Sequence, residues 1–267
     1  MRRLSELMSL RGRRALITGG AGHIATAMAE TLAEMGADLV LVDIDQARLD
    51  DLTTCLIESY RVQVRPIRCD LEDERDRSAV IAAINADGAG LDILINNAAF
   101  VGTSGLQGWA VPFESQTLET WRRALEVNLT AVFHLSQALT PLLKTSGHGA
   151  IINVGSIYGE LGPDWALYEE TTMANPAAYG ISKGGVFQLT RWLATTVAPD
   201  IRVNAISPGG VARGQPEKFV GKYVARTPLQ RMATEDDFRG AVAFLASDAS
   251  AYVTGQVIRV DGGWGIW

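Results

Sequence analysis

Short apolar segments alternate with longer amphipathic segments along the whole chain of 267 residues. Most apolar segments are rich in β-branched residues and continuously apolar, which is typical of parallel strands covered by helices on both faces. Segments such as 24–35 between them have a helical stripe of apolar residues. Because strands separated by such helices form right-handed crossovers, the pattern predicts an α/β fold with a doubly wound parallel sheet. The expected strands are 14–18, 38–43, 63–69, 93–96, 150–154, 202–206 and 257–260.

The composition argues against several other classes of protein. Hydrophobic residues make up 47% of the chain and charged residues 20%, so a sizeable core can form and disorder is not expected. The net charge of −6 gives no electrostatic basis for a nucleic-acid partner. No apolar segment is long enough to span a membrane, and the start of the chain has no signal-peptide pattern.

The cysteines and the even composition bear on location and domain organisation. Cys55 and Cys69 provide neither a disulfide framework nor a metal-ligand spacing, and the three histidines are scattered, so we expect no metal and a cytoplasmic location. No repeat, linker or shift in composition marks a boundary. We therefore expect one domain over residues 1–267, with 1–11 as an N-terminal extension.

A glycine-rich turn follows the first expected strand and precedes the first expected helix. Residues 18–25 read Thr-Gly-Gly-Ala-Gly-His-Ile-Ala. Glycines in this position let the backbone approach a diphosphate, whose charge meets the N–H groups of the helix N-terminus. Asp43 closes the second strand, 24 residues after Gly19, where a carboxylate accepts hydrogen bonds from ribose hydroxyls and repels a 2′-phosphate. Because residues 20–25 contain no lysine or arginine, NAD is favoured over NADP.

Tyr179 and Lys183 lie four residues apart, and Ser156 ends an apolar strand upstream. Residues at this spacing share one face of a helix. A nearby ammonium lowers the pKa of a phenol, so the tyrosine can exchange a proton with a substrate hydroxyl or carbonyl. Tyr158 and Tyr168 were weighed for the same role, but neither has a lysine four residues later.

Together these motifs resemble the short-chain dehydrogenase/reductase family in its compact, single-domain, Rossmann-like branch. The resemblance covers nearly the whole chain, with the motifs in the family's order. It implies a catalytic tetrad of Asn128, Ser156, Tyr179 and Lys183. It also implies cofactor contacts at Gly19, Gly22, His23, Ile24, Asp43, Asp70, Leu71, Asn97, Ala98, Tyr179, Lys183, Pro208, Gly209 and Val211.

The implied reaction is hydride transfer between NAD and a secondary alcohol, or the reverse on a ketone. Tyr179 moves the proton, Lys183 lowers its pKa and holds the nicotinamide ribose, and Ser156 binds the substrate oxygen. The family also implies a homo-oligomer, a tetramer or dimer, built on the helices expected at 118–143 and 176–198. The aromatic tail at 264–267 suits a second subunit interface, or folds back on its own subunit.

Three features depart from the family pattern. His23 and Ala25 occupy glycine positions of the cofactor motif, and His23 either contacts the diphosphate or only covers the loop. Arg213 occupies the register of a threonine that holds the nicotinamide carboxamide. Ser156 and Tyr179 are 23 residues apart, which predicts an additional loop at about 164–175.

Three loops are expected around the substrate: 100–114, 164–173 and a mobile flap at 213–228. Their aromatic and acidic residues suggest a sugar or amino-sugar-like substrate, although the aromatics could instead pack the loop down and the glutamates could face water or a neighbouring subunit. The candidate substrate residues are Trp109, Tyr158, Trp165, Tyr168 and Glu169.

Two other functions remain open at this stage. A 3-oxoacyl-thioester reductase on this fold would use NADPH and basic residues such as Arg122 and Arg123, against which Asp43 argues. An NAD-sensing or scaffold protein without turnover is a different class. Such proteins often lose the tyrosine or the lysine, and both are present here.

Overall fold

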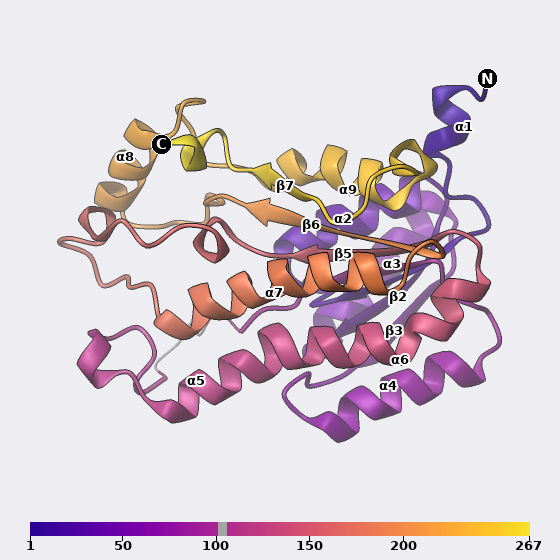
Figure 1. Cartoon of the computed structure of the whole chain (residues 1–267), viewed down its shortest axis with the longest axis horizontal. Helices are drawn as coiled ribbons and strands as arrows, with labels where there is room; N and C mark the ends of the chain where they lie inside the picture. The colour runs from indigo at the N-terminus through magenta and orange to yellow at the C-terminus, as the bar shows by residue number, and fades with distance from the viewer. Residues whose placement is uncertain (101–105) are drawn as a thin grey trace.

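Seven parallel strands form one sheet in the order β3-β2-β1-β4-β5-β6-β7 in the computed structural model (Figure 1). The structure describes residues 1–100 and 106–267. The strand order changes direction between β1 and β4, which is where ligands bind in sheets of this kind. The strands are β1 (Arg14–Thr18), β2 (Asp38–Asp43), β3 (Val64–Arg68), β4 (Ile93–Asn96), β5 (Gly149–Val154), β6 (Ile201–Pro208) and β7 (Val257–Val260).

The doubly wound parallel sheet predicted from the alternating pattern is confirmed, and four of the seven strands have the expected bounds. The third strand is shorter than 63–69 by one residue at each end, and β5 begins one residue early. The sixth strand is longer than 202–206 because Ser207 and Pro208 continue the ladder opposite Arg259 and Val260 of β7.

Strand residues face two separate cores, which explains why the strands are apolar without alternation. In β1, Ala15 and Ile17 pack with α2 (His23–Glu34), α3 (Gln46–Tyr60) and α9 (Arg239–Ala246). Leu16 points to the opposite face and packs with α4, α6 and α7. These helices span Glu74–Ala86, Ala131–Thr145 and Ala177–Thr196, and α8 spans Glu217–Arg226.

The helical segment expected at 118–143 is one long helix that is interrupted by a turn of a different helical type. α5 (Leu118–Leu125) passes into a π-helical turn at Glu126–Thr130, and α6 continues the helix from Ala131. A π turn widens the helix locally and is frequent at functional sites. Asn128 lies in this turn and is completely buried.

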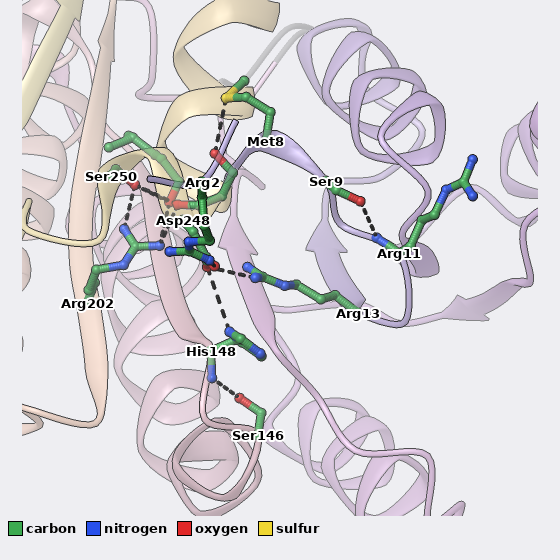
Figure 2. Close-up of polar contacts among 12 residues, drawn as sticks. Arg2, Met8, Ser9, Arg11, Arg13, Ser146, His148, Arg202, Asp248 and Ser250 are labelled. Carbon is green, nitrogen blue, oxygen red and sulfur yellow. Dashed lines mark hydrogen bonds and ion pairs between the residues drawn. The ribbon is translucent and has the colours of Figure 1, made fainter. Parts of the chain in front are cut away.

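A cluster of ionic contacts holds the N-terminal extension at the amino ends of the strands (Figure 2). The Asp248 carboxylate lies 2.7 Å from Arg2 Nη1 and 2.6 Å from Arg13 Nη2. His148 Nδ1 is 3.7 Å from the same carboxylate. Arg202 lies alongside and donates to Ser250 Oγ at 2.7 Å. The cluster joins the residues that precede α1 (Leu4–Met8) to the segments before β1 and β5 and after α9.

The C-terminal aromatic residues fold back onto their own subunit. The Trp264 side chain is buried and stacks on Tyr223 of α8, with ring centroids 5.7 Å apart. The Arg226 guanidinium lies 4.3 Å from the Trp264 ring, and Trp267 Nε1 donates to the Arg226 carbonyl at 3.0 Å. The tail therefore braces α8. Within residues 1–100 and 106–267, no helix combines the length and apolarity needed to cross a membrane.

Candidate active site

Two cavities lie at the carboxyl ends of the strands. The first, of about 440 Å³, lies beyond β1, β2, β3 and β4. The second, of about 490 Å³, lies beyond β5 and β6. The predicted cofactor residues that line the first cavity are Gly19, Gly22, His23, Ile24, Asp43, Asp70, Leu71, Asn97 and Ala98. Ser156, Tyr179, Pro208 and Gly209 line the second.

The glycine loop is shaped for close approach of a ligand. Gly19 has a positive φ of 64°, and a Cβ at this position would lie 2.8 Å from the Ala98 Cα. The side chain of Asn97 donates to the carbonyls of Thr18 and Gly19 at 3.1 and 3.2 Å, which holds the loop open. Gly22 precedes the first residue of α2, so free N–H groups of this helix face the loop. These features fit the diphosphate of a dinucleotide.

Asp43 lies where the adenosine ribose of such a cofactor is expected. Its carboxylate accepts hydrogen bonds from the N–H groups of Ala21 at 3.0 Å and Asp45 at 3.1 Å. The next residue, Ile44, is exposed and carries no charge. Both contacts use backbone donors, so further lone pairs of the carboxylate remain for a hydroxyl ligand.

Ser156, Tyr179 and Lys183 come together as the sequence predicts. Ser156 lies two residues after the end of β5, where its Oγ accepts from the Tyr158 N–H at 3.2 Å. Tyr179 lies in the first turn of α7 and lines the second cavity. The buried Lys183 donates from Nζ to the Val154 carbonyl at 2.8 Å. Its ammonium is 6.0 Å from the centroid of the Tyr179 ring.

The electrostatics bear on the expectation that Lys183 lowers the pKa of Tyr179. Burial raises the pKa of Tyr179, and its interaction with Ser156 opposes that rise without cancelling it. Burial also lowers the pKa of Lys183 to about 8, because the ammonium has left water without gaining a carboxylate partner. Desolvation therefore sets the direction of both shifts, and the expected effect of Lys183 on the pKa of Tyr179 stays a prediction.

Asn128 connects the π turn to both catalytic segments. Its Nδ2 donates to Ser182 Oγ at 3.0 Å, next to Lys183 in α7. Its Oδ1 accepts from the backbone N–H of Phe100, at the edge of the first cavity. The side chain thus ties the cofactor side of the site to the tyrosine helix.

The second cavity contains aromatic and neutral polar side chains. Tyr168 donates from its hydroxyl to that of Tyr158 at 2.6 Å, and Asn175 Nδ2 lies 3.4 Å from the Tyr168 hydroxyl. Burial raises the pKa of both phenols, so they remain neutral donors at neutral pH. No charged side chain lines this cavity among the described residues. The cavity therefore suits an uncharged polar molecule.

Comparisons with known proteins agree with this geometry. A family model described as enoyl-(acyl carrier protein) reductase matches residues 19–265. Cis-4-hydroxycyclohexanecarboxylate dehydrogenase of Sinomonas cyclohexanicum is 34% identical over 94% of this chain and 95% of its own. Galactitol 2-dehydrogenase of Rhizobium johnstonii is 34% identical over 97% of both chains.

A solved structure shows the same likeness in three dimensions. The gluconate 5-dehydrogenase of Burkholderia cenocepacia, in complex with NADP and tartrate, has a TM-score of 0.85 and 30% identity. The alignment covers 99% of this chain and 100% of that chain. The chain belongs to the short-chain dehydrogenase/reductase family. It is accordingly an oxidoreductase of the NAD(P)-binding type.

Some residues predicted for substrate binding in this short-chain dehydrogenase/reductase lie away from the second cavity. Trp109, Tyr158 and Tyr168 line it. The Glu169 side chain is 69% exposed and pairs with Lys222 at 3.3 Å. Trp165 is 57% exposed and packs beside Tyr168, with ring centroids 5.8 Å apart. The proposed role of Glu169 as an acceptor for the substrate is therefore wrong in this geometry, because an exposed lysine of α8 holds its carboxylate outside.

Several cavity residues of this protein were not predicted from the sequence. Met173 and Asn175 lie within the expected additional loop at 164–175, which contributes one wall. Gln215, Phe219, Tyr223 and Met232 come from the expected flap and the segment after it. The helical spacing in α8 could have identified two of these residues, because Phe219 and Tyr223 are four residues apart on its buried face. Val211 pairs with Ala233 and lines neither cavity, and the loop predicted at 100–114 falls partly outside the described residues.

Proposed function

We propose that this short-chain dehydrogenase/reductase is an NAD-dependent dehydrogenase that interconverts a secondary alcohol and a ketone on an uncharged, sugar-like substrate. The observation that carries the proposal is the position of Ser156 and Tyr179, which lie together in the wall of the second cavity. A substrate oxygen placed between these groups can exchange a proton with Tyr179 and accept a hydrogen bond from Ser156.

The chemistry divides between cofactor and protein. When bound, the nicotinamide supplies or accepts the hydride at the carbinol carbon. Oxidation of an alcohol requires the phenolate form of Tyr179, which would take the hydroxyl proton while Ser156 holds the oxygen that becomes the carbonyl. Lys183 shares a face of α7 with Tyr179 and is fixed by the Val154 carbonyl at the end of β5, where its charge would favour the phenolate.

The preference for NAD follows from the ribose end of the first cavity. The carboxylates of Asp43, Asp70 and Glu72 line it, and Arg123 is already paired with Glu72 at 2.8 Å. A 2′-phosphate would meet these negative charges. The related gluconate 5-dehydrogenase structure contains NADP, so the choice in this chain rests on its own residues.

The substrate class follows from the second cavity and from the relatives. Neutral hydroxyl and amide groups of Tyr158, Tyr168 and Asn175 can bind hydroxyl groups, whereas the cavity offers no carboxylate for an amine. The names of two relatives contain galactitol and 4-hydroxycyclohexanecarboxylate, both of which have secondary hydroxyl groups. The amino-sugar alternative loses its support because Glu169 lies outside.

The direct test follows reduced nicotinamide by absorbance while NAD⁺ and a panel of polyols, cyclic alcohols, sugars and hydroxyacyl thioesters are supplied. Turnover on a polyol or cyclic alcohol that disappears in Tyr179→Phe supports the proposal. Turnover only on hydroxyacyl thioesters would favour a 3-oxoacyl-thioester reductase. NADH binding without turnover on any compound would favour the sensing or scaffold function.

We also propose how the protein assembles and where in the cell it is located. Ile181 and Trp192 are more than half exposed on α7, which suits the subunit contact proposed for this helix in a dimer or tetramer. Cys55 is an exposed, unpaired thiol, which suits a reducing, cytoplasmic environment. Sedimentation of the purified protein would test the assembly.

A further inference from the structure

Two residues at the mouth of the first cavity share one carboxylate oxygen. His23 Nδ1 lies 3.8 Å from Glu235 Oε1, and Arg213 Nη2 lies 3.3 Å from the same atom. His23 and Arg213 both line the cavity. They are also two of the positions at which the sequence departs from the family pattern, His23 at a glycine and Arg213 at a threonine. Because both residues approach the same carboxylate, they form one cluster and are not two unrelated changes.

Glu235 is held in a fixed position to serve as this common partner. It is the first residue of a short 3-10 helix, Glu235–Phe238, that packs against α2 and precedes α9. The Asp237 carboxylate caps this turn by accepting from the Thr234 N–H at 2.7 Å. Phe238 is buried in the core shared by α2 and α9. The carboxylate therefore connects the start of α2 to the segment that follows β6.

The charges around the first cavity indicate which group Arg213 could bind. The other arginine in the lining, Arg123, is neutralised by Glu72. The glycine loop itself has no lysine or arginine at 20–25, so the backbone N–H groups provide its only attraction for a diphosphate. Arg213 has a planar guanidinium with donors on two edges, so one edge can contact a carboxylate while another contacts a phosphate.

We propose that Glu235 orients Arg213 to bind the diphosphate of the dinucleotide, and that His23 braces the same carboxylate from α2. This inference rests on the proposed dinucleotide-dependent function. Arg213 thereby supplies the charge that the glycine loop lacks, and Glu235 acts as a positioning residue. In this proposal, His23 replaces a glycine because its imidazole supports the Glu235 carboxylate. The glycine loop itself does not need the side chain.

The test measures equilibrium binding by titration calorimetry with three probes: NADH, ADP-ribose and adenosine. Arg213→Gln should weaken NADH and ADP-ribose by about tenfold each and leave adenosine unchanged, because only the first two contain the diphosphate. Arg231→Gln is the matched control. Arg231 pairs with Asp237 of the same 3-10 turn at 2.6 Å and lines a different cavity, so its loss should change none of the three affinities.

The positioning role is tested by a double-mutant cycle with Glu235→Ala. If Glu235 orients the guanidinium, Arg213→Gln should cost no more than about threefold in the Glu235→Ala background. Additive losses would overturn that role. Loss of NADH affinity with ADP-ribose unchanged would place Arg213 on the nicotinamide and overturn the proposal. Absence of alcohol turnover, with Arg213-dependent ADP-ribose binding intact, would contradict the proposed function alone.

Discussion

Lys183 donates to the carbonyl of Val154, and its ammonium nitrogen is 6.0 Å from the ring centroid of Tyr179 on the same helix face. The lysine is therefore placed by the end of β5 and not by contact with the tyrosine hydroxyl. Tyr179 lines the second cavity together with Ser156, which follows the same strand. Tyr179, which transfers the proton, and Lys183, which supplies the supporting charge, are therefore placed by different contacts near the end of β5.

Replacing Tyr179 with Phe should remove proton transfer while leaving the cofactor cavity intact. We expect kcat to fall by about 10²- to 10⁴-fold, the usual contribution of a positioned acid-base group. NADH affinity should change by less than about twofold, because the lost hydroxyl lines the other cavity. Steady-state kinetics and NADH fluorescence measure the two effects. Turnover that survives the change would assign the proton to another group.

Replacing Lys183 with Met should change how stability depends on pH. The pKa of Lys183 is about 8 in the folded protein, against 10.5 for the free group, so burial of the ammonium costs most below pH 8. Between pH 8 and 10.5 the folded wild type releases this proton before the unfolded chain does, and its stability rises. The stability of the wild type relative to Lys183→Met should therefore increase by about 3 kcal/mol across this interval.

Urea unfolding at several pH values measures this difference. Lys144→Met serves as the control, since the Lys144 side chain is 45% exposed and pairs with Asp200 at 3.6 Å. A parallel pH dependence in wild type and Lys183→Met would contradict the assignment of the proton to Lys183.

Replacing Asp43 with Asn should weaken the preference for NAD. The amide oxygen can still accept from the Ala21 N–H, so the glycine loop should keep its shape. Loss of the negative charge removes the repulsion of a 2′-phosphate, and we expect the ratio of NADH to NADPH affinity to fall by about tenfold. An unchanged ratio would mean that another group discriminates between the cofactors.

Replacing Tyr168 with Phe should weaken substrate binding more than catalysis. The change removes the hydroxyl that donates to Tyr158 at 2.6 Å, and with it one donor in the cavity wall. KM for a polyol should rise by about five- to tenfold while kcat changes by less than twofold. Tyr252→Phe, at a fully exposed tyrosine, is the control. An unaltered KM would remove Tyr168 from the substrate contacts.

Replacing Asp248 with Asn should destabilise the protein at neutral pH. Burial acts to raise the pKa of Asp248, but hydrogen bonds from Arg2 and Arg13 outweigh it, so the pKa is lowered from 3.8. The stabilisation is present above the unfolded pKa and is lost as pH falls through the folded one. We expect a loss of about 1–3 kcal/mol at pH 7 that shrinks below pH 4. Asp236→Asn, at a side chain that is 85% exposed, should have little effect in the same unfolding experiment.

The sequence predicted the sheet well because the strand signal is local. Ala15, Leu16 and Ile17 are all apolar because helices cover both faces of β1, and no distant contact is needed to recognise this. The order of the glycine loop, Asp43, Ser156 and Tyr179 along the chain was also sufficient to bring the candidate site together, since each follows or faces the end of a strand.

What the sequence did not predict depends on contacts between distant segments. The exposure of Glu169 is set by Lys222, 53 residues away. The pKa of Tyr179 is set by burial, which residue spacing does not reveal. The meeting of His23, Arg213 and Glu235 likewise requires three segments to pack together. Proposed roles for the tetrad and for the cofactor residues stay predictions until the experiments above are done.

Because Trp264 packs against Tyr223, loss of the last few residues should have a larger effect than their place at the end of the chain suggests. A nonsense mutation just before Trp264 would leave all seven strands and the glycine loop encoded. It would also remove the support of α8, whose Tyr223 hydroxyl accepts from the Gly210 N–H at 2.6 Å beside the second cavity. In a screen for lost activity, such alleles would group with active-site mutations, and a fusion tag would be better tolerated at the opposite terminus.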